Sequence, residues 1–129
     1  MEKINRLMIN ICSANVMKSR DFYIQLFDFE VSFDSDWFVQ LVSKDKNLEL
    51  GIIDKTNDMV PKDVRNNPQG FYITFVVDNV DEVYVTAKSK QLEIVSEPRD
   101  TFYGQRQLLL KDPDGALLDI SSPIKGFKF

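Results

Sequence analysis

The sequence predicts an α+β fold in which one βαβββ pattern occurs twice within 129 residues. The pattern spans residues 1–53 and 71–123, and Met8–Val16 matches Tyr72–Val80 at an offset of about 64 residues. In each copy an apolar strand leads to an asparagine that can cap a helix. A helix followed by a run of strands, rather than strict alternation of strand and helix, favours α+β over a doubly wound parallel sheet.

The first copy predicts a helix over residues 17–26, with either Asn15 or Ser19 at its N-terminus as the cap. Its apolar residues recur at i, i+3 and i+4 spacings and form one stripe of Phe22, Tyr23, Leu26 and Phe27. Three strands are then expected over residues 29–33, 37–42 and 48–53. Residues 44–47 form the turn between the last two strands.

The second copy predicts a helix over residues 80–90, again preceded by an asparagine. Asn79 is followed three residues later by Glu82, which is the spacing of a capping box. Strands are expected over residues 93–96, 106–110 and 116–121. The turn between the last two is Asp112-Pro-Asp-Gly115, where proline fixes φ and glycine accepts a positive φ.

Residues 54–70 connect the two copies and contain two prolines, a glycine and alternating charges. We expect a plain surface connector rather than a functional flap, with room for a helical turn around residues 60–64. The chain is thus expected to be one domain, 1–129, with modules 1–53 and 71–123 and a tail, 124–129. Two readings of the tail stay open: Ile124, Phe127 and Phe129 pack across a subunit interface, or the terminus frays.

Composition places the chain near the average for a soluble domain, with 43% apolar and 28% charged residues. The net charge of −4 argues against a nucleic-acid partner and mildly favours a cationic ligand, although ordinary solubility also explains it. No apolar run is long enough to span a membrane, and the N-terminus lacks the features of a secretory signal. The single cysteine, Cys12, fits a reducing compartment, so we expect a cytoplasmic protein.

Two motifs resemble those of the vicinal oxygen chelate superfamily. Ser19-x-x-Phe22-Tyr23-x-x-x-Phe27-Asp28-Phe29 is similar to its S-x-x-F-Y-x-x-x-L-G-F pattern, and Lys111-Asp-Pro-Asp-Gly-Ala-Leu-Leu-Asp119-Ile is similar to its D-P-D-G-N-x-x-E-L pattern. The superfamily includes glyoxalase I, extradiol dioxygenases, fosfomycin-resistance enzymes and bleomycin-resistance proteins. The resemblance implies two modules whose sheets curl around a cleft, with the helices outside, and a homodimer as the usual assembly.

The chain departs from the family pattern at both helix ends. The glycine that follows the first helix is replaced by Asp28, and the one that follows the second helix by Gln91. Asp tolerates the left-handed conformation better than Gln does, so we expect the second helix end to be built differently.

The resemblance also implies four metal-ligand positions, which in this chain are Met8, Glu49, Tyr72 and Asp119. Family members that use a metal have histidines at the first and third of these positions, and this chain contains no histidine. A thioether and a neutral phenol are poor ligands for Zn²⁺, Ni²⁺ or Fe²⁺, and two carboxylates alone hold Mg²⁺ or Mn²⁺ only loosely. We therefore expect no metal and no other cofactor.

The missing ligands turn the expected function from catalysis to binding. The chain resembles the bleomycin-resistance proteins, which bind drugs without a catalytic metal, so we expect it to sequester an aromatic or cationic compound. The alternative is a glyoxalase- or dioxygenase-like enzyme that uses Glu49 and Asp119, which requires burial and mutual repulsion to raise the pKa of one of them. In a third interpretation, Glu49 and Asp119 form an acidic patch on the cleft wall and have no catalytic role.

The ligand-binding residues that we expect are Met8, Trp37, Glu49, Tyr72, Phe102, Tyr103, Arg106 and Asp119. The aromatic faces offer large contact areas and attract cations. Each has a competing interpretation: Phe38, Phe102 and Tyr103 are also typical core or dimer contacts, and Met8 is also typical of packing in a cleft wall. Arg106 either projects into the pocket or pairs with a surface acid.

Overall fold

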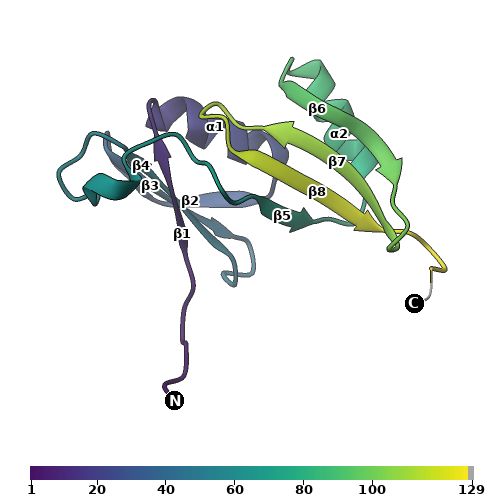
Figure 1. Ribbon diagram of the computed structural model, residues 1–129, viewed down its shortest axis with the longest axis horizontal. Coiled ribbons are helices and arrows are strands. Elements are labelled where there is room, and N and C mark those ends of the chain that lie inside the picture. The colour runs from purple at the N-terminus through teal and green to yellow at the C-terminus, as the bar shows by residue number, and fades with distance from the viewer. Residues whose placement is uncertain (128–129) are drawn as a thin grey trace. The chain divides into compact units, whose positions relative to one another are not determined.

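The computed structural model describes residues 1–127, and the part of the predicted tail contact that involves Phe129 lies outside this range (Figure 1). The chain forms two compact units, Met1–Pro68 and a second that begins at Gln69. Each unit contains one four-stranded sheet and one α-helix, which confirms the α+β prediction. Within the described residues, no helix is long and apolar enough to cross a lipid bilayer.

The first unit contains β1 (Ile9–Ser13), α1 (Val16–Leu26), β2 (Phe29–Asp34), β3 (Phe38–Ser43) and β4 (Glu49–Asp54). Its strands lie in the order β1-β4-β3-β2, with β1 parallel to β4 and the other pairs antiparallel. The connector contains the expected helical turn, a 3₁₀-helix at Lys62–Val64. Arg65 donates to the carbonyl of the buried Val60 at 2.8 Å and so ties the connector to itself.

The second unit repeats this topology with β5 (Ile73–Val76), α2 (Val80–Ser89), β6 (Glu93–Asp100), β7 (Gln105–Lys111) and β8 (Leu117–Pro123). Its strand order is β5-β8-β7-β6, again with one parallel pair, β5 and β8. β6 is longer than predicted and contains Pro98, which the sheet accommodates because β6 is an edge strand with two register shifts.

Asparagines cap both helices. The Asn15 side chain accepts from the backbone N–H of Lys18 at 3.1 Å, which decides between the two predicted caps. Ser19 is instead buried, with its hydroxyl 2.9 Å from that of Ser13. In α2 the Asn79 side chain accepts from two first-turn amides, as predicted.

The two helix ends differ, but in the opposite sense to the one expected. Gln91 adopts the left-handed conformation, with φ of 57°, whereas Asp28 does not. The N–H of Gln91 donates to Lys88 O at 3.1 Å and that of Leu92 to Ala87 O at 3.0 Å, which is a Schellman motif. The first helix needs no such turn because the chain leaves it at Phe27 in an extended conformation and enters β2 directly.

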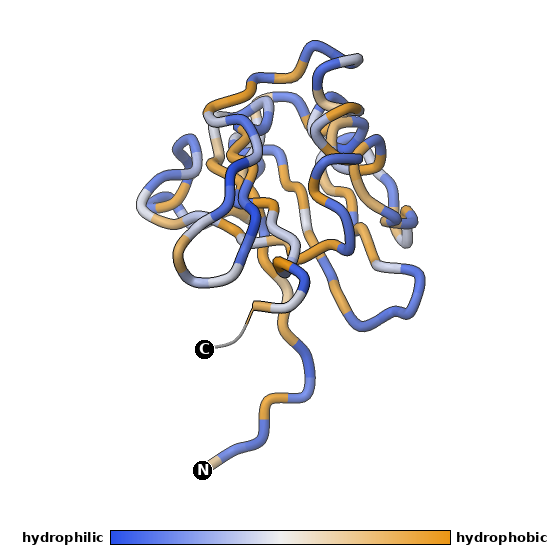
Figure 2. Tube along the Cα trace, turned by 90° about the vertical axis from the view of Figure 1, so that its right-hand side faces the viewer, coloured by the Kyte–Doolittle hydropathy of each residue, from blue (hydrophilic) through white to orange (hydrophobic). Residues whose placement is uncertain are grey.

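Alternate strand residues pack beneath the helix of each unit and form its core. In the first unit these include Ile11, Val39, Leu41, Leu50 and Ile52, with Phe22 and Tyr23 from α1. In the second they include Leu108, Leu110, Leu118 and Ile120, with Val80, Val83 and Ala87 from α2. Figure 2 shows the resulting pattern of apolar strands joined by mainly hydrophilic loops. Since strand side chains alternate, the intervening residues lie on the sheet faces that point away from the helices.

Candidate functional site

Glu49 lies on the first of these faces, which we call the Glu49 face and define by Met8, Asn10, Gln40, Glu49 and Gly51. Glu49 is the first residue of β4, and its side chain is 13% exposed. Ile9 pairs with Leu50, so Met8 and Glu49, one residue earlier on each parallel strand, are neighbours. The structure thus brings together two of the sequence-predicted site residues.

The Glu49 carboxylate is already paired. Arg6 donates to both of its oxygens, from Nε to Oε2 at 2.6 Å and from Nη2 to Oε1 at 2.5 Å. Gln40 adds a third bond, from Nε2 to Oε1 at 2.6 Å. The hydrogen bonds from Arg6, together with those of Gln40 and the charge of Arg6, hold the pKa of Glu49 below its usual value, against the opposing effect of desolvation. Glu49 is therefore ionised near neutral pH.

Arg6 is a site residue that the sequence analysis missed, because it precedes the first predicted strand. Its guanidinium also lies 3.8 Å from the Met8 sulfur. Arg6 and Met8 are two residues apart, and in extended chain this spacing puts both side chains on one face. Continuing the two-residue alternation of strand side chains from Met8 back toward the N-terminus would have identified Arg6.

Gly51 lies beneath the Asn10 side chain on the Glu49 face. A Cβ atom at this position would clash with the Asn10 side-chain oxygen and lie 3.1 Å from the Phe38 ring. The missing side chain therefore accommodates the Asn10 amide next to an aromatic ring. Trp37 is 37% exposed and its ring centroid is 5.9 Å from that of Phe38, so the aromatic surface continues past the start of β3.

The corresponding face of the second unit carries Tyr72, Thr74, Val76, Asp119 and Ser121, and we call it the Asp119 face. Burial alternates along β5, where Val76 is 66% exposed, and Tyr72, the residue before β5, is 61% exposed. Asp119 is only 8% exposed and accepts from two hydroxyls, Thr74 at 3.0 Å and Ser121 at 2.6 Å. Within residues 1–127 it forms no ion pair, so its environment differs from that of Glu49.

The two acids do not occupy equivalent places in their units. Glu49 lies beside Met8, the residue before β1, whereas the β5–β8 register pairs Asp119 with Thr74. Tyr72, the repeat equivalent of Met8, lies two residues before Thr74. The structure therefore places Tyr72 and Asp119 on one face but one step apart along it.

Phe102 and Tyr103 lie in the loop between β6 and β7. Phe102 is 92% exposed, and its ring packs edge-on against Tyr103 at 5.2 Å between centroids. The Tyr103 hydroxyl accepts from the Gln107 side chain at 3.4 Å, and Gln107 pairs with Ser121 of the Asp119 face. The backbone of Gly104, with φ of 89°, lies against the Phe127 ring, where any side chain would clash.

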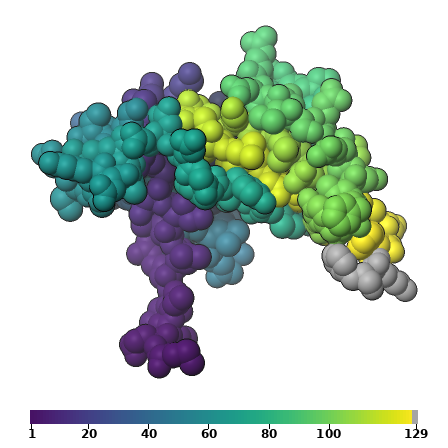
Figure 3. Space-filling model, viewed as in Figure 1, coloured from purple at the N-terminus to yellow at the C-terminus, as the bar shows by residue number. Residues whose placement is uncertain are grey.

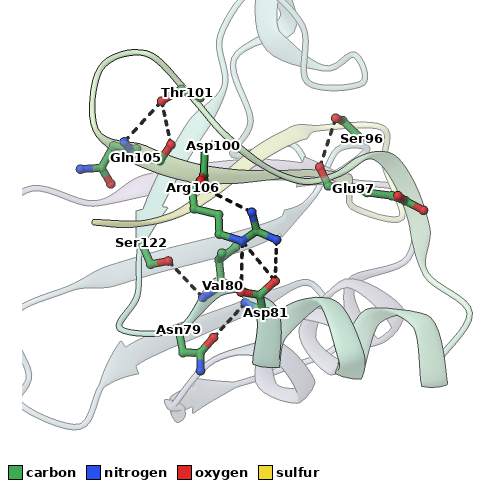
Figure 4. A network of polar contacts seen from close by, with 10 residues as sticks. All are labelled: Asn79, Val80, Asp81, Ser96, Glu97, Asp100, Thr101, Gln105, Arg106 and Ser122. Atoms are coloured by element: carbon green, nitrogen blue, oxygen red, sulfur yellow. Dashed lines mark hydrogen bonds and ion pairs between the residues drawn. The ribbon is translucent and has the colours of Figure 1, made fainter. Parts of the chain in front are cut away.

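Arg106 pairs with acids, as the alternative interpretation of its side chain had it (Figure 4). Its guanidinium bonds Asp81, in the first turn of α2, at 3.1 Å and Asp100, at the end of β6, also at 3.1 Å. In the β7–β8 ladder Arg106 is the partner of Ser122, whose hydroxyl accepts from the backbone N–H of Val80 at 3.3 Å. Arg106 therefore fastens α2 to the β6–β7 hairpin, and we leave it out of the proposed ligand contacts.

The donor atoms do not suit the metal that the resemblance implies. The part of the chain that the structure describes contains no cluster of three or more His, Cys, Asp or Glu side chains that could hold an ion. Arg6 donates to both Glu49 oxygens, so an ion could bind this carboxylate only by displacing Arg6. The neighbours at the former histidine positions, Met8 and Tyr72, contribute a thioether and a phenol.

The model of one protein family, described as the Glyoxalase/Bleomycin resistance protein/Dioxygenase superfamily, matches residues 3–120. Among solved structures, a member of this superfamily from Sphaerobacter thermophilus is 22% identical and has a TM-score of 0.74, covering 93% of this chain and 98% of its own. No curated protein matches the chain.

Two further structures show the same fold. A glyoxalase/bleomycin resistance protein/dioxygenase from Nocardioides is 17% identical, with a TM-score of 0.73 over 99% of this chain and 89% of its own. TioX from Micromonospora is 15% identical, with a TM-score of 0.70 over 94% of this chain and all of its own (100%). At these identities the similarity concerns the fold alone.

Proposed function

Because the chain belongs to the Glyoxalase/Bleomycin resistance protein/Dioxygenase superfamily, we propose that it is a metal-free binding protein that sequesters a small cationic or aromatic compound. Members of this superfamily are often dimers that bind small ligands. The proposed contacts, taken for each unit by itself, are the predicted site residues other than Arg106: Met8, Trp37 and Glu49 in the first unit, and Tyr72, Phe102, Tyr103 and Asp119 in the second.

The observation that carries this proposal is the environment of Asp119. Its carboxylate is almost fully buried and is hydrogen-bonded by hydroxyls, without a cationic side chain beside it among residues 1–127. A buried carboxylate is costly unless it gains an opposite charge, so a ligand cation would be stabilised here. The exposed Tyr72 ring on the same face adds a surface that attracts cations and aromatic rings.

The geometry offers less support for the enzymatic alternative. A carboxylic acid that donates a proton near neutral pH needs a raised pKa, and the pKa of Glu49 is lowered by Arg6. The same pairing makes Glu49 a weak base. Glu49 is therefore poorly suited to acid–base chemistry near neutral pH.

We further propose that the protein is a homodimer in the cytoplasm. β2 is an edge strand that exposes two large apolar side chains, Val31 at 42% and Phe33 at 50%. An apolar edge strand is a surface that proteins usually cover. The only cysteine in the chain, Cys12, is buried, which supports a compartment where disulfides are not needed.

A thermal-shift screen with planar cationic drugs, aminoglycosides and glycopeptides tests the proposed function. A compound present at about 100 times its Kd should stabilise the protein by about 2.7 kcal/mol, which is a shift of several degrees. Asp119→Asn should weaken binding of the best compound about tenfold or more, since it removes the buried charge. Asp58→Asn, at an exposed position in the connector, serves as the matched control.

Two results would contradict the proposal. One is a screen in which no compound stabilises the protein. The other is a stoichiometric divalent ion, found by elemental analysis of the purified protein and lost from Asp119→Asn, which would favour a metal enzyme.

A further inference from the structure

We propose that a ligand can displace the Arg6 side chain from the Glu49 carboxylate. The ligand group that takes its place is a guanidinium or an amidinium. This inference rests on the proposed small-molecule binding and adds a ligand class for one face of the first unit. It begins from the three hydrogen bonds that Glu49 accepts.

The geometry of the Arg6 contact identifies the ligand class. One edge of the guanidinium, Nε and Nη2, donates to the two separate oxygens of Glu49 at 2.6 and 2.5 Å. A planar group with two parallel N–H bonds matches this arrangement, whereas an ammonium is a single point charge and does not. Glu49 is therefore shaped for a guanidinium or amidinium edge in particular.

The two partners differ in how firmly the fold holds them. The Glu49 side chain is 13% exposed and belongs to a central strand, whereas the Arg6 side chain is 60% exposed. Arg6 belongs to the segment before β1, where residues 1–7 are all exposed and without regular structure. Figure 3 shows this purple segment standing away from the rest of its unit. The carboxylate thus stays in place when Arg6 leaves.

Release of Arg6 costs little by itself, because ion pairs with so exposed a partner contribute weakly to stability. A vacated Glu49, however, would lose both donors of Arg6, and a planar bidentate donor restores them better than separate waters do. We therefore expect a ligand guanidinium to replace that of Arg6, and we do not expect Glu49 to remain without a cation. Gln40 keeps its own bond to Oε1 throughout and so keeps the carboxylate oriented.

The surroundings of Glu49 suit the rest of such a ligand. Gly51 lies two residues along the same face and has no side chain, and the Phe38 ring lies beside it. The Asn10 side chain covers Gly51, so a flat ring attached to the cation would lie beside the Asn10 amide and against the Phe38 ring. An aromatic amidine combines both features.

Benzamidine is the probe for the test, with benzylamine as the ammonium of similar size. Binding is followed by ¹H–¹⁵N NMR titration of the full chain. Arg6→Ala should tighten benzamidine binding about two- to fivefold, which is the range for losing a competitor held by a weak ion pair. Arg20→Ala, which removes an arginine paired with Asp21 and Asp34 in the same unit, should change nothing.

Further variants separate the ligand class from the competition. Glu49→Gln in the Arg6→Ala background should abolish the preference for benzamidine over benzylamine, and Arg6→Lys should give an intermediate affinity. In the wild type, the Arg6 Nε–H signal should shift as benzamidine is added. Because Arg6 is exposed, its variants keep the fold, which the amide spectrum verifies.

Unchanged or weaker benzamidine binding by Arg6→Ala would overturn the inference, as would equal affinity for benzylamine. The proposed function is judged separately, by the drug screen and by Asp119→Asn. A protein that binds a compound through Asp119, yet responds to neither Arg6 nor Glu49 variants, would retain the proposed function and lose this one.

Discussion

The Glu49 carboxylate accepts three hydrogen bonds, two from the Arg6 guanidinium and one from the Gln40 amide. At the residue scale this pairing changes what an acid on a sheet face can do. A carboxylate that is already paired with a cation binds a second cation only by exchange, whereas one bonded by hydroxyls, such as Asp119, needs no exchange. The two acids of the predicted site therefore act in different ways.

Arg6 sets the pH dependence of the Glu49 face. The folded pKa of Glu49 lies below the ordinary value of 4.5, so the pair stabilises the fold fully above that pH. This contribution is lost as the pH falls through the lower, folded pKa. In Arg6→Ala the pKa of Glu49 should rise toward 4.5, as measured by NMR titration of the side-chain carboxyl carbon.

The control for this titration is Arg20→Ala, which leaves the Arg6 contact intact. A Glu49 carboxyl that titrates identically in the wild type and in Arg6→Ala would show that the pair does not form in solution.

At the element scale, the end of α2 has a residue whose backbone conformation favours glycine. Gln91 has φ of 57°, and left-handed backbone costs an L-residue about 1 kcal/mol. Gln91→Gly should raise the free energy of unfolding by about 0.5 to 1 kcal/mol, after allowance for the greater freedom of glycine in the unfolded chain. Urea denaturation measures the change.

Gln91→Ala is the matched variant, because it keeps the Cβ atom and should leave stability nearly unchanged. Equal stabilisation by Ala and Gly would mean that the Gln side chain, and not the backbone conformation, is unfavourable.

The turn between β7 and β8 depends on one acid. The Asp112 side chain accepts from the backbone N–H groups of Asp114 and Ala116, both at 2.9 Å, inside a buried turn. Asp112→Ala leaves both donors without this acceptor and should cost about 1 to 3 kcal/mol of stability in urea denaturation. Asp36→Ala, at an exposed position, should cost little, and a comparable loss there would contradict this role for the turn.

Much of the element order could be predicted because local chemistry decides it. Asn79 caps α2 and the Asp112-Pro-Asp-Gly115 turn forms as expected, since both act through neighbours in the sequence. The extension of β6 past Pro98 could not be predicted, because a proline interrupts a strand unless the strand lies at a sheet edge, which is a tertiary property.

The candidate site was less predictable than the fold. Met8 and Glu49 are neighbours, but the pairing of Glu49 with Arg6 depends on a contact over 43 residues of sequence. The repeated pattern of strands likewise does not predict the β5–β8 register, which places Asp119 beside Thr74. Alternation gives the face on which a residue lies but not its neighbour on the next strand.

At the scale of the whole molecule, the exposed edge strand β2 is the feature that the homodimer proposal uses. Phe33→Glu places a charge on this edge, where Phe33 is 50% exposed, and should shift sedimentation velocity from dimer toward monomer. Val85→Glu, at a 67% exposed position on α2, tests for a general effect of added charge and should leave the dimer intact. A wild type that sediments as a monomer at every concentration would contradict the proposal.

The different positions of the two acids in their units also have a consequence for redesign. A histidine beside each acid would have to replace Met8 in the first unit but Thr74, rather than Tyr72, in the second. The two strand pairs keep the same register, with Ile9 opposite Leu50 and Ile73 opposite Leu118, but the acid of the second unit lies two residues further along its strand. A substitution copied from one half to the other therefore reaches the wrong neighbour. Building a metal site into this chain therefore calls for different changes in the two units.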